Sequence, residues 1–552
     1  MPGMTETSFP TLAADILAGI LDRDPVEATY LGDHTRDGSL PDPAPAATAA
    51  RAVVVRTQLA ALDTDRPGPP DEQVDADILR TALAAELLEI DELREAEWNP
   101  MLYNPGGGIH SLISRDFAPA RHRLESVVGR LTAVPDYLAA ARERLTEPSR
   151  IHLDTALAQL DGTAALIDTE LPAAVPDGAP AELRRRVADA AATARAALDV
   201  HREWLAARRD SATRDPRLGE SRFRAKLALT LDTAFEPAAL LARAERDLDR
   251  VTWEITEQAG QLAGVARPDA ATVRAVLDRL AEDAPADATI LGLCRAALAS
   301  TTDFVREHDL VTLYDDPVAV VEMPEIDRGV AVAYCRENGP LETAVLPTEF
   351  AVSPAPAGWD ADRVASFYRE YNAHMVQNLT VHEAMPGHAL QLMHARRHRA
   401  GTGVRAVLRS GSFIEGWAVY AEELMAGRGY GGAGAGALRM QQLKMQLRSL
   451  INTVLDIRFH CGDLDEAAAL DLMVGRGFQE RGEALGKWQR VQLTSTQLCT
   501  YYVGYAEVGE LVRDLRAARP EASDRTIHDA VLAHGCPPAR HLRTLLGLPP
   551  AS

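Results

Sequence analysis

The chain has 552 residues, a formal net charge of −22 and a pI near 5.2. The negative charge argues against nucleic acid and anionic membrane surfaces as partners, because the field of the protein repels phosphate. The five cysteines are scattered and form no C-x-x-C pair, so neither a disulfide framework nor a thiolate zinc site is expected.

The N-terminal segment, residues 1–10, lacks a basic region followed by an apolar run. No stretch of the chain approaches the roughly 18 to 20 apolar residues that a membrane span needs. We therefore expect a cytoplasmic protein without a membrane partner.

Helical spacing of apolar residues begins at Phe9 and runs to Leu21, and Ala-rich amphipathic segments continue along most of the chain. Proline-containing breaks at 65–70 and 172–180 predict loops between packed helices. Gly106 to Gly108 predict a tight turn, because the Gly-Lys-Ser/Thr of a phosphate-binding loop does not follow. The expected fold class is mainly α.

A change of period between about residues 312 and 354 predicts one small β-sheet. Segments 328–335 and 343–352 contain β-branched and aromatic residues, and Pro347 suggests an edge strand or a bulge. The free edge of such a sheet could pair with an extended peptide, or the strands could form a purely structural hairpin. The sequence leaves both interpretations open.

Three residues with metal-site chemistry follow this sheet within seven positions: His382, Glu383 and His388. Two imidazoles and a carboxylate are typical of zinc hydrolases, in which a Glu beside a ligand handles protons. The spacing differs from the helical H-E-x-x-H pattern, because residues six apart are separated by roughly 240° on a regular helix.

Pro386 resolves this conflict of spacing. It lacks the N–H that would bond the carbonyl of His382, so the helix must widen or break, and Gly387 permits an unusual backbone. We predict a Pro-Gly bulge that brings His388 beside His382 and leaves Glu383 free to act as a base.

A downstream helical run supplies a candidate third ligand, Glu415, beside the bulky Trp417. Glu422 and Glu423 lie later on the same helix and are interpreted as surface charges or as a pair that supports the ligands. The glycine-rich segment 427–437 is either a mobile loop near the site or a surface insertion, and the sequence does not decide between them.

A long helix is predicted from Leu438 to His460, with Asp456 and His460 on one face. Either Asp456 orients His460 to stabilise an oxyanion, or the two form a structural interhelical pair. Further on, the Tyr501 hydroxyl could donate to an oxyanion and Arg490 could hold a substrate carboxylate. Both residues could instead be ordinary buried hydrogen-bonding residues.

The pattern H-E-A-x-P-G-H at 382–388, followed by E-G-W-A-x-Y at 415–420, resembles the domain of unknown function (DUF) 885 family of predicted bacterial zinc metallopeptidases. Residues near both ends of the chain also fit the family pattern: Asp24, Pro25, Ala28, Thr29, Gly32, His34, Asp37, Leu40, Asp42, Asp456, His460, Arg490, Gln497, Tyr501 and Gly504. The resemblance covers nearly the whole chain, and it favours the functional interpretation of Asp456 and His460.

The resemblance implies a large, helical, oligopeptidase-like architecture with a channel or cleft and one small β-sheet next to the metal helix. We expect residues 1–310 to form a helical N-terminal part that makes one wall of the cleft. Residues 311–552 would form the catalytic part, within one continuous DUF885-like unit.

The expected activity is that of a zinc metallopeptidase that cleaves amide bonds of short peptides. One zinc ion would be held by His382, His388 and Glu415 and would activate a water, from which Glu383 takes a proton as general base. His460, Tyr501 and Arg490 complete the expected catalytic set.

Two alternatives remain open. The metal ligands fit the family pattern, but four positions that could contact the substrate depart from it and leave the kind of substrate open: Ala389, Asn452, Ser495 and Thr496. A zinc hydrolase or lyase acting on a small amino-acid-derived metabolite is therefore the first alternative. The second is a catalytically silent binding protein, which the intact Glu383 disfavours. The oligomeric state and the choice between endo- and exopeptidase action are left open.

Overall fold

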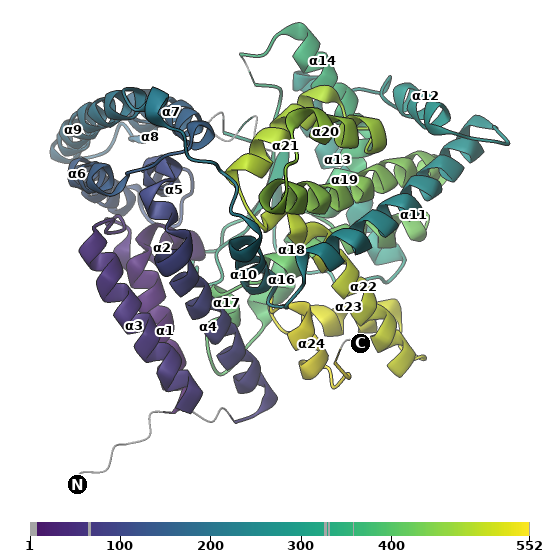
Figure 1. Ribbon diagram of the computed structural model, residues 1–552, viewed down its shortest axis with the longest axis horizontal. Coiled ribbons are helices and arrows are strands. Elements are labelled where there is room, and N and C mark those ends of the chain that lie inside the picture. Colours follow the sequence, from purple (N-terminus) through teal and green to yellow (C-terminus); the bar gives the residue numbers. More distant parts are fainter. Residues whose placement is uncertain (1–7, 65–67, 325–327, 329–331, 357, 551–552) are drawn as a thin grey trace. The chain divides into compact units, whose positions relative to one another are not determined.

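The computed structural model describes residues 8–64, 68–324, 328, 332–356 and 358–550 (Figure 1). The chain divides into two compact units. The first comprises Met1–Pro216, Asn338–Leu346 and Ala400–Val407, and the second comprises Arg217–Glu337, Pro347–Arg399 and Leu408–Ser552. Residue 310, the boundary predicted from the sequence, falls inside the second unit.

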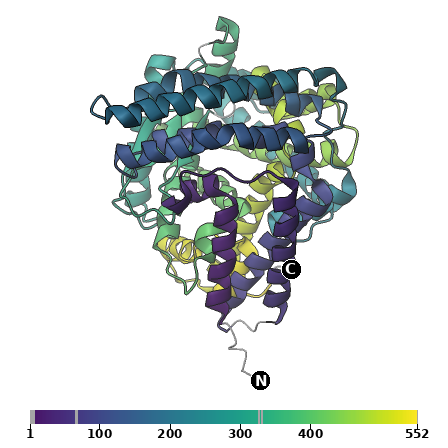
Figure 2. The ribbon, with the colours of Figure 1, turned by 90° about the vertical axis from the view of Figure 1, so that its left-hand side faces the viewer.

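The first unit is built from helices. These are α1 (Phe9–Arg23), α2 (Pro25–Leu31), α3 (Pro45–Thr64), α4 (Pro70–Leu88), α5 (Gly106–Ile113), α6 (Ala120–Arg144), α7 (Arg150–Ala165), α8 (Leu171–Ala174), α9 (Ala181–Ala206) and α17 (Val404–Val407). The long helices α6 and α9 lie side by side, as Figures 1 and 2 show. Their facing apolar residues, among them Leu131 and Leu198, are buried in one core, so the amphipathic pattern of the sequence corresponds to this packing.

Most predicted boundaries in this unit agree with the structure. The helix expected from Phe9 is α1, and the predicted break at 65–70, whose residues 65–67 lie outside the described part, separates α3 from α4. The tight turn predicted at Gly106 is wrong, because Gly106 begins helix α5. Its backbone N–H donates to the side chain of Asn104 at 3.0 Å, which satisfies an N–H that the first turn of a helix leaves free.

The second unit contains the remaining helices and the sheet. Its helices are α10 (Glu220–Leu231), α11 (Pro237–Ala263), α12 (Ala270–Leu280), α13 (Asp287–Glu307), α14 (Ala361–Glu370), α15 (Ala373–Glu383), α16 (His388–Arg397), α18 (Gly411–Gly427), α19 (Ala435–Cys461), α20 (Glu466–Leu470), α21 (Arg481–Leu493), α22 (Thr500–Ala518), α23 (Asp524–Leu532) and α24 (Ala539–Leu545). Helix α19, predicted as 438–460, packs against α11 and α22, and most of its side chains are buried. Within the described residues, no helix combines the length and apolar character of a membrane span.

Three strands form the small sheet: β1 (Val318–Glu322), β2 (Ala333–Arg336) and β3 (Thr348–Val352). Their order is β1-β3-β2, with β1 parallel and β2 antiparallel to β3. Two of the strands were predicted, although residues 329–331 of the first segment lie outside the described part. The edge or bulge predicted at Pro347 is wrong, because β3 is the central strand. Pro347 immediately precedes it, where its missing N–H breaks no ladder bond.

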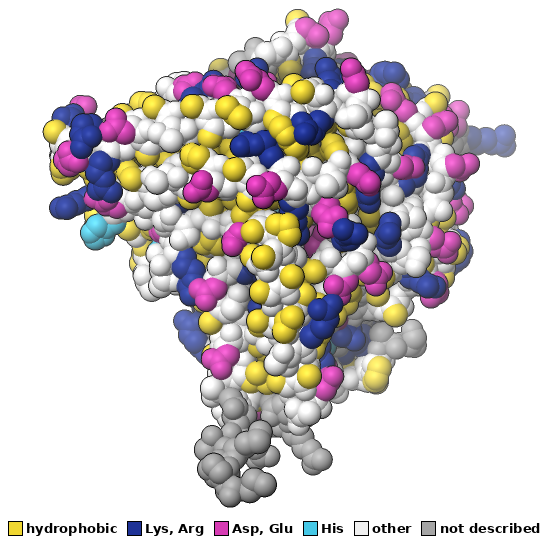
Figure 3. All heavy atoms as spheres, turned by 60° about the vertical axis from the view of Figure 1, so that its left-hand side comes forward, with side chains coloured by type: hydrophobic (Ala, Val, Ile, Leu, Met, Phe, Trp, Pro, Cys, Tyr) yellow, Lys and Arg dark blue, Asp and Glu magenta, His cyan; other side chains and the backbone are white. Residues whose placement is uncertain are grey.

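The mainly α fold with one small sheet is therefore confirmed, and β2 packs against α15, the helix that carries His382. None of the five cysteines, all of which lie in the described part of the chain, forms a disulfide, as their spacing predicted. On the face drawn in Figure 3, acidic and basic side chains are interspersed with apolar ones. Such interspersed charge is typical of a solvated surface.

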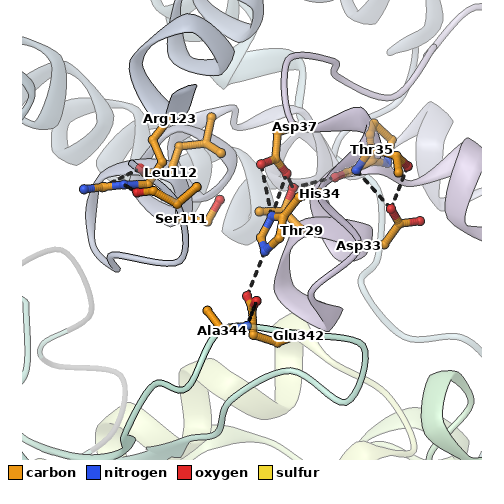
Figure 4. A network of polar contacts seen from close by, with 12 residues as sticks. Thr29, Asp33, His34, Thr35, Asp37, Ser111, Leu112, Arg123, Glu342 and Ala344 are labelled. Carbon is orange, nitrogen blue, oxygen red and sulfur yellow. Dashed lines mark hydrogen bonds and ion pairs between the residues drawn. The ribbon is translucent and has the colours of Figure 1, made fainter. Parts of the chain in front are cut away.

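A buried polar network in the first unit links the end of α2 to the segment Asn338–Leu346 (Figure 4). His34 lies between two carboxylates: its Nδ1 is 3.0 Å from Asp37 Oδ2, and its Nε2 is 2.8 Å from Glu342 Oε2. The ring also stacks on Phe117, with 3.9 Å between the ring centroids. Both nitrogens can donate to these carboxylates only when the imidazole is protonated.

This network gives a testable pH dependence. Burial opposes the charge on His34, but hydrogen bonds to Asp37 and Glu342 outweigh it and raise the pKa of His34 above 6.5. A raised folded-state pKa stabilises the fold at pH values below the unfolded pKa, and this contribution is lost as the pH rises through the folded pKa. We expect His34→Gln to flatten the fall of the thermal unfolding midpoint as the pH rises from about 6.5 through the raised folded-state pKa of His34. The exposed His122 provides the control, and an unchanged slope in His34→Gln would contradict the assignment.

Candidate metal centre

The segment that carries both histidines contains a sharp break between two helices. Helix α15 ends at Glu383 and α16 begins at His388, with a cis peptide bond between Met385 and Pro386. The N–H of Gly387 donates to the carbonyl of Val381 at 2.9 Å, which closes the turn. The break predicted from Pro386 is thus confirmed.

The break places the two imidazoles side by side. The ring centroids of His382 and His388 are 4.7 Å apart, with an interplanar angle of 86°. Trp417 fixes the turn to helix α18, because its indole N–H donates to the carbonyl of Pro386 at 2.8 Å. The same helix carries Glu415 two residues earlier, so one side chain of α18 holds the turn while another faces the imidazoles.

The three predicted ligands come together. Glu415 Oε2 lies 3.5 Å from His382 Nε2 and 3.5 Å from His388 Nε2, and the ligand atoms of all three residues lie within 4.8 Å of one another. Zinc–ligand bonds of about 2.1 Å in tetrahedral geometry separate two ligand atoms by about 3.4 Å. In the described part of the chain, Glu415 Oε2 is buried and has no hydrogen-bond partner. A buried oxygen without a donor between two imidazoles fits a cation, so these residues suit a zinc ion.

Glu422 holds His382 through the ring nitrogen that faces away from Glu415. Its Oε1 accepts a hydrogen bond from His382 Nδ1 at 2.7 Å, and its Oε2 accepts from the Asn378 amide at 2.6 Å. Glu422 is 1% exposed, so it is a buried partner of a ligand and not a surface charge. With Nδ1 as the donor, the Nε2 lone pair of His382 points to the side where Glu415 lies, which is the tautomer that a metal requires.

We expect Glu422→Gln to weaken zinc binding roughly 10- to 100-fold, the usual effect of losing a carboxylate behind a ligating histidine. The amide removes the negative charge and leaves one acceptor atom for two donors. A competitive titration with a zinc-sensitive dye would measure the change. Glu423→Gln is the matched control, since Glu423 is the next residue and accepts instead from Tyr505 at 2.6 Å. Equal zinc affinities in the two variants would contradict the role of Glu422.

Electrostatics distinguish the carboxylates. Burial and the nearby Glu415 raise the pKa of Glu383, although both imidazoles and the backbone of Cys335 in β2 oppose this. Burial would also raise the pKa of Glu415, but the two imidazoles lower it well below its usual range. A buried carboxyl group with a raised pKa is suited to exchanging protons, whereas one held ionised is suited to binding a cation.

The same electrostatics act on His382. Burial opposes its charged form, but its contacts with Glu415 and Glu422 raise its pKa well above 6.5. A proton held this strongly would compete with a cation for the ring nitrogen, so metal binding should release protons.

Two of the other predicted site residues, Tyr501 and Arg490, contact each other. Arg490 Nη2 donates to the Tyr501 hydroxyl at 3.2 Å and to Gln497 Oε1 at 2.8 Å. Gln497 also donates to the Tyr501 hydroxyl at 3.4 Å, which leaves the proton of that hydroxyl available for another acceptor. Burial and the nearby Glu415 raise the pKa of Tyr501, which places its hydroxyl in the electrostatic field of the candidate ligand.

His460 has a different environment from the one the oxyanion role requires. Its Nε2 donates to the carbonyl of Thr494 at 2.8 Å, and its Nδ1 accepts from the backbone N–H of Leu218 at 3.3 Å. Asp456 lies 3.7 Å away, beyond hydrogen-bond length. Burial lowers the pKa of His460 to about 4, so the ring is neutral and both nitrogens bond to backbone. This geometry gives the oxyanion role no support, and it also differs from the predicted structural pair, because His460 bonds to the backbone of Thr494 and Leu218 and not to Asp456.

Comparison with solved structures identifies similar folds. A protein from Shewanella oneidensis, described as a "putative lipoprotein of unknown function", is 28% identical with a TM-score of 0.82, over 98% of this chain and 99% of that chain. A "putative lipoprotein" from Colwellia psychrerythraea is 14% identical with a TM-score of 0.81, over 98% of this chain and 100% of that chain. No functionally curated protein matches this chain.

These neighbours correct one expectation. The cytoplasmic location predicted from residues 1–10 and from the lack of a long apolar stretch is contradicted, because each of these two similar structures is described as a "putative lipoprotein". Lipoproteins carry a covalent lipid that attaches them to a membrane surface, and such attachment needs no spanning helix. The absence of an apolar stretch therefore could not establish the compartment.

Residues 25–546 match the family model described as bacterial protein of unknown function (DUF885). The matched range contains His382, His388 and Glu415, together with Glu383 and Glu422. The family resemblance inferred from the two short patterns around these residues is thus confirmed over most of the chain. The chain belongs to the DUF885 family of bacterial proteins of unknown function.

Proposed function

We propose that this protein is a zinc-dependent hydrolase, most specifically a metallopeptidase acting on amide bonds of short peptides. The observation that supports it best is the position of Glu415 Oε2, which is buried, receives no hydrogen bond from the described residues, and lies 3.5 Å from the Nε2 atoms of His382 and His388. Two imidazoles and one carboxylate leave a fourth position of a tetrahedral ion open, as in catalytic and not structural zinc sites.

Zinc bound by these ligands would act as a Lewis acid on a water and on the substrate carbonyl. Glu383 is buried beside His382, and its raised pKa suits it to accept a proton at Oε during attack and to return it to the leaving amine. Tyr501 can donate its free hydroxyl proton to an oxygen that gains charge, and Arg490 holds that hydroxyl in place.

A peptide substrate is favoured over a general small amide by the position of the sheet. Strand β2 is an edge strand that packs against α15, and the Cys335 backbone of β2 influences the pKa of Glu383. An extended peptide added to this edge would run past the base, which is the mode of recognition that edge strands offer.

Metal analysis of the purified protein, followed by digestion of a short-peptide library with and without a chelator, tests the proposal. We expect about one zinc per chain and cleavage that the chelator stops and added zinc restores. A zinc-loaded protein that cleaves only small amino-acid-derived amides would support the metabolite hydrolase instead. Protein that binds no divalent metal would overturn the proposal.

A further inference from the structure

Two buried or half-buried cations on helix α21, Lys487 and Arg490, form no ion pair with any acidic side chain among the described residues. Lys487 is 5% exposed, and Arg490 lies one turn later on the same face of the helix. In the described chain, no carboxylate comes within ion-pair distance of either side chain, and the Lys487 ammonium makes no hydrogen bond. Among the described residues, Arg490 makes its hydrogen bonds through Nη2, which leaves Nε and Nη1 for a further acceptor.

The neighbouring cations of the same unit are compensated. Lys444 pairs with Glu370 at 2.9 Å, and Arg448 pairs with Glu483 and contacts the Tyr371 hydroxyl at 3.3 Å. Burying a charge without a partner is costly, and natural cores pair such charges or use them to bind ligands. Lys444 and Arg448 have acidic partners, whereas the two cations of α21 have none among the described residues. These two cations are therefore suited to an anion that the chain itself does not supply.

The unpaired cations lie towards the candidate metal centre. Tyr501, which Arg490 contacts, is one turn before Gly504 on α22. Gly504 packs directly on α18, since a Cβ placed there would lie 1.8 Å from the carbonyl oxygen of Ser412 and 3.0 Å from the α-carbon of Gly416. Tyr501 therefore projects along the face of α22 that meets the start of α18, where Glu415 lies.

Electrostatics agree with this placement. Burial lowers the pKa of Lys487 well below its ordinary value, and Arg448 and Arg490 lower it further, whereas Glu483 and Glu415 oppose the shift. The Glu415 carboxylate thus acts on Lys487 as well as on Tyr501. A bound anion would relieve the repulsion between Lys487 and Arg490.

We propose that Lys487 and Arg490 form a subsite for the free carboxylate of a substrate whose scissile amide lies at the His382–His388–Glu415 cluster. The inference rests on the proposed hydrolase function and specifies its substrate class. The protein would remove C-terminal residues from short peptides or cleave N-acylated amino acids, because Arg490 contacts Tyr501 on helix α22, which packs directly on the start of α18 beside Glu415. Bonds far from a free carboxylate would be poor substrates.

Binding to metal-free protein tests the subsite without any turnover. Calorimetric titration would use N-acetyl amino acids with apolar, acidic and basic side chains, each beside its uncharged C-terminal amide. We expect at least one acid to bind about tenfold or more tightly than its amide, since hydrogen bonds to charged groups are worth more than neutral ones. Lys487→Met and Arg490→Met should each remove most of this preference, while Arg481→Met, which removes an exposed charge from the same helix, should keep it.

These variants separate a loss of the subsite from a loss of folding. Replacing an unpaired buried lysine by methionine keeps the apolar stem and removes the charge, so Lys487→Met is expected to fold at least as stably as the parent protein. Arg490→Lys is the second variant, because it keeps the charge but loses the planar fork, and it should retain only part of the preference for the acid. Preference for the acid that survives in both Met variants would overturn the assignment of the subsite.

Failure of this inference is distinguishable from failure of the hydrolase proposal. If metal-free protein binds acids and amides equally, the subsite is disproved, yet chelator-sensitive cleavage of the peptide library would still support the hydrolase. A zinc-loaded protein that cleaves amidated peptides as fast as free acids would also overturn the subsite. Binding of acids by a protein that never takes up zinc would disprove the hydrolase, and with it the substrate role of the subsite.

Discussion

Glu383→Gln is expected to reduce turnover by about 10²- to 10⁴-fold while the zinc content stays at the parent level. The amide is close in size to the carboxylate and does not belong to the three ligands, so the metal site should remain. It cannot accept a proton, however, and the buried position of Glu383 leaves no bulk water to replace it. Metal analysis and peptide hydrolysis on the same preparation would measure both quantities.

His388→Ala provides the paired result. Removing this imidazole leaves one histidine and one carboxylate, so both the zinc content and the activity should be lost. The two variants therefore separate binding from chemistry: Gln at 383 keeps the metal and loses the rate, whereas Ala at 388 loses both. Activity close to the parent level in Glu383→Gln would remove Glu383 from the mechanism.

The sequence predicted the core of the candidate centre because the relevant constraints are local. His382 and His388 are six residues apart, and an unbroken helix could not have brought them together. Pro386 between them disrupts a regular helix, so the helix had to widen or break, and either change could bring the two imidazoles round one metal ion. Glu415 was predicted as a third ligand because it lies near the start of the next helical run, beside Trp417, and the structure shows that Trp417 holds the turn at Pro386.

Features that depend on tertiary packing were harder to predict. Glu422 is seven residues after Glu415, two helical turns along the same face of α18, and this spacing could have identified it as a buried partner of the site. Nothing in the sequence around His460 shows that Leu218 and Thr494 would occupy its two nitrogens, because both contacts come from distant segments. The family pattern favoured a functional His460, but a pattern does not distinguish a residue that holds the fold from one that contacts substrate.

Strand β1 is another feature that depends on tertiary contacts and that the sequence did not predict. It was not predicted as a separate strand, because Val318–Glu322 is short and its role depends on pairing with β3, thirty residues later. The unpaired state of Lys487 was equally invisible, since charge pairing in a helical core depends on which helices face one another.

Gly387→Ala is expected to destroy the centre and to lower the free energy of unfolding by about 3 kcal/mol or more. The φ of Gly387 is −70°, so glycine is required here by close approach and not by a left-handed backbone. A Cβ at this position would lie 1.9 Å from the carbonyl oxygen of His382 and 2.3 Å from that of Val381. Both contacts are with backbone, which cannot rotate away as a flexible side chain could.

The turn would have to open to admit the methyl group, and its two ends carry the imidazoles that share Glu415. Chemical denaturation and a zinc titration would therefore show a coupled loss, in stability and in metal affinity. Gly411→Ala is the matched control: Gly411 begins α18, a Cβ added there would meet no atom within 4 Å, and alanine is the better helix former. Gly411→Ala should therefore bind zinc like the parent protein and unfold at the same or a slightly higher denaturant concentration. A Gly387→Ala variant that behaves the same way would show that the tight turn does not set the positions of the ligands.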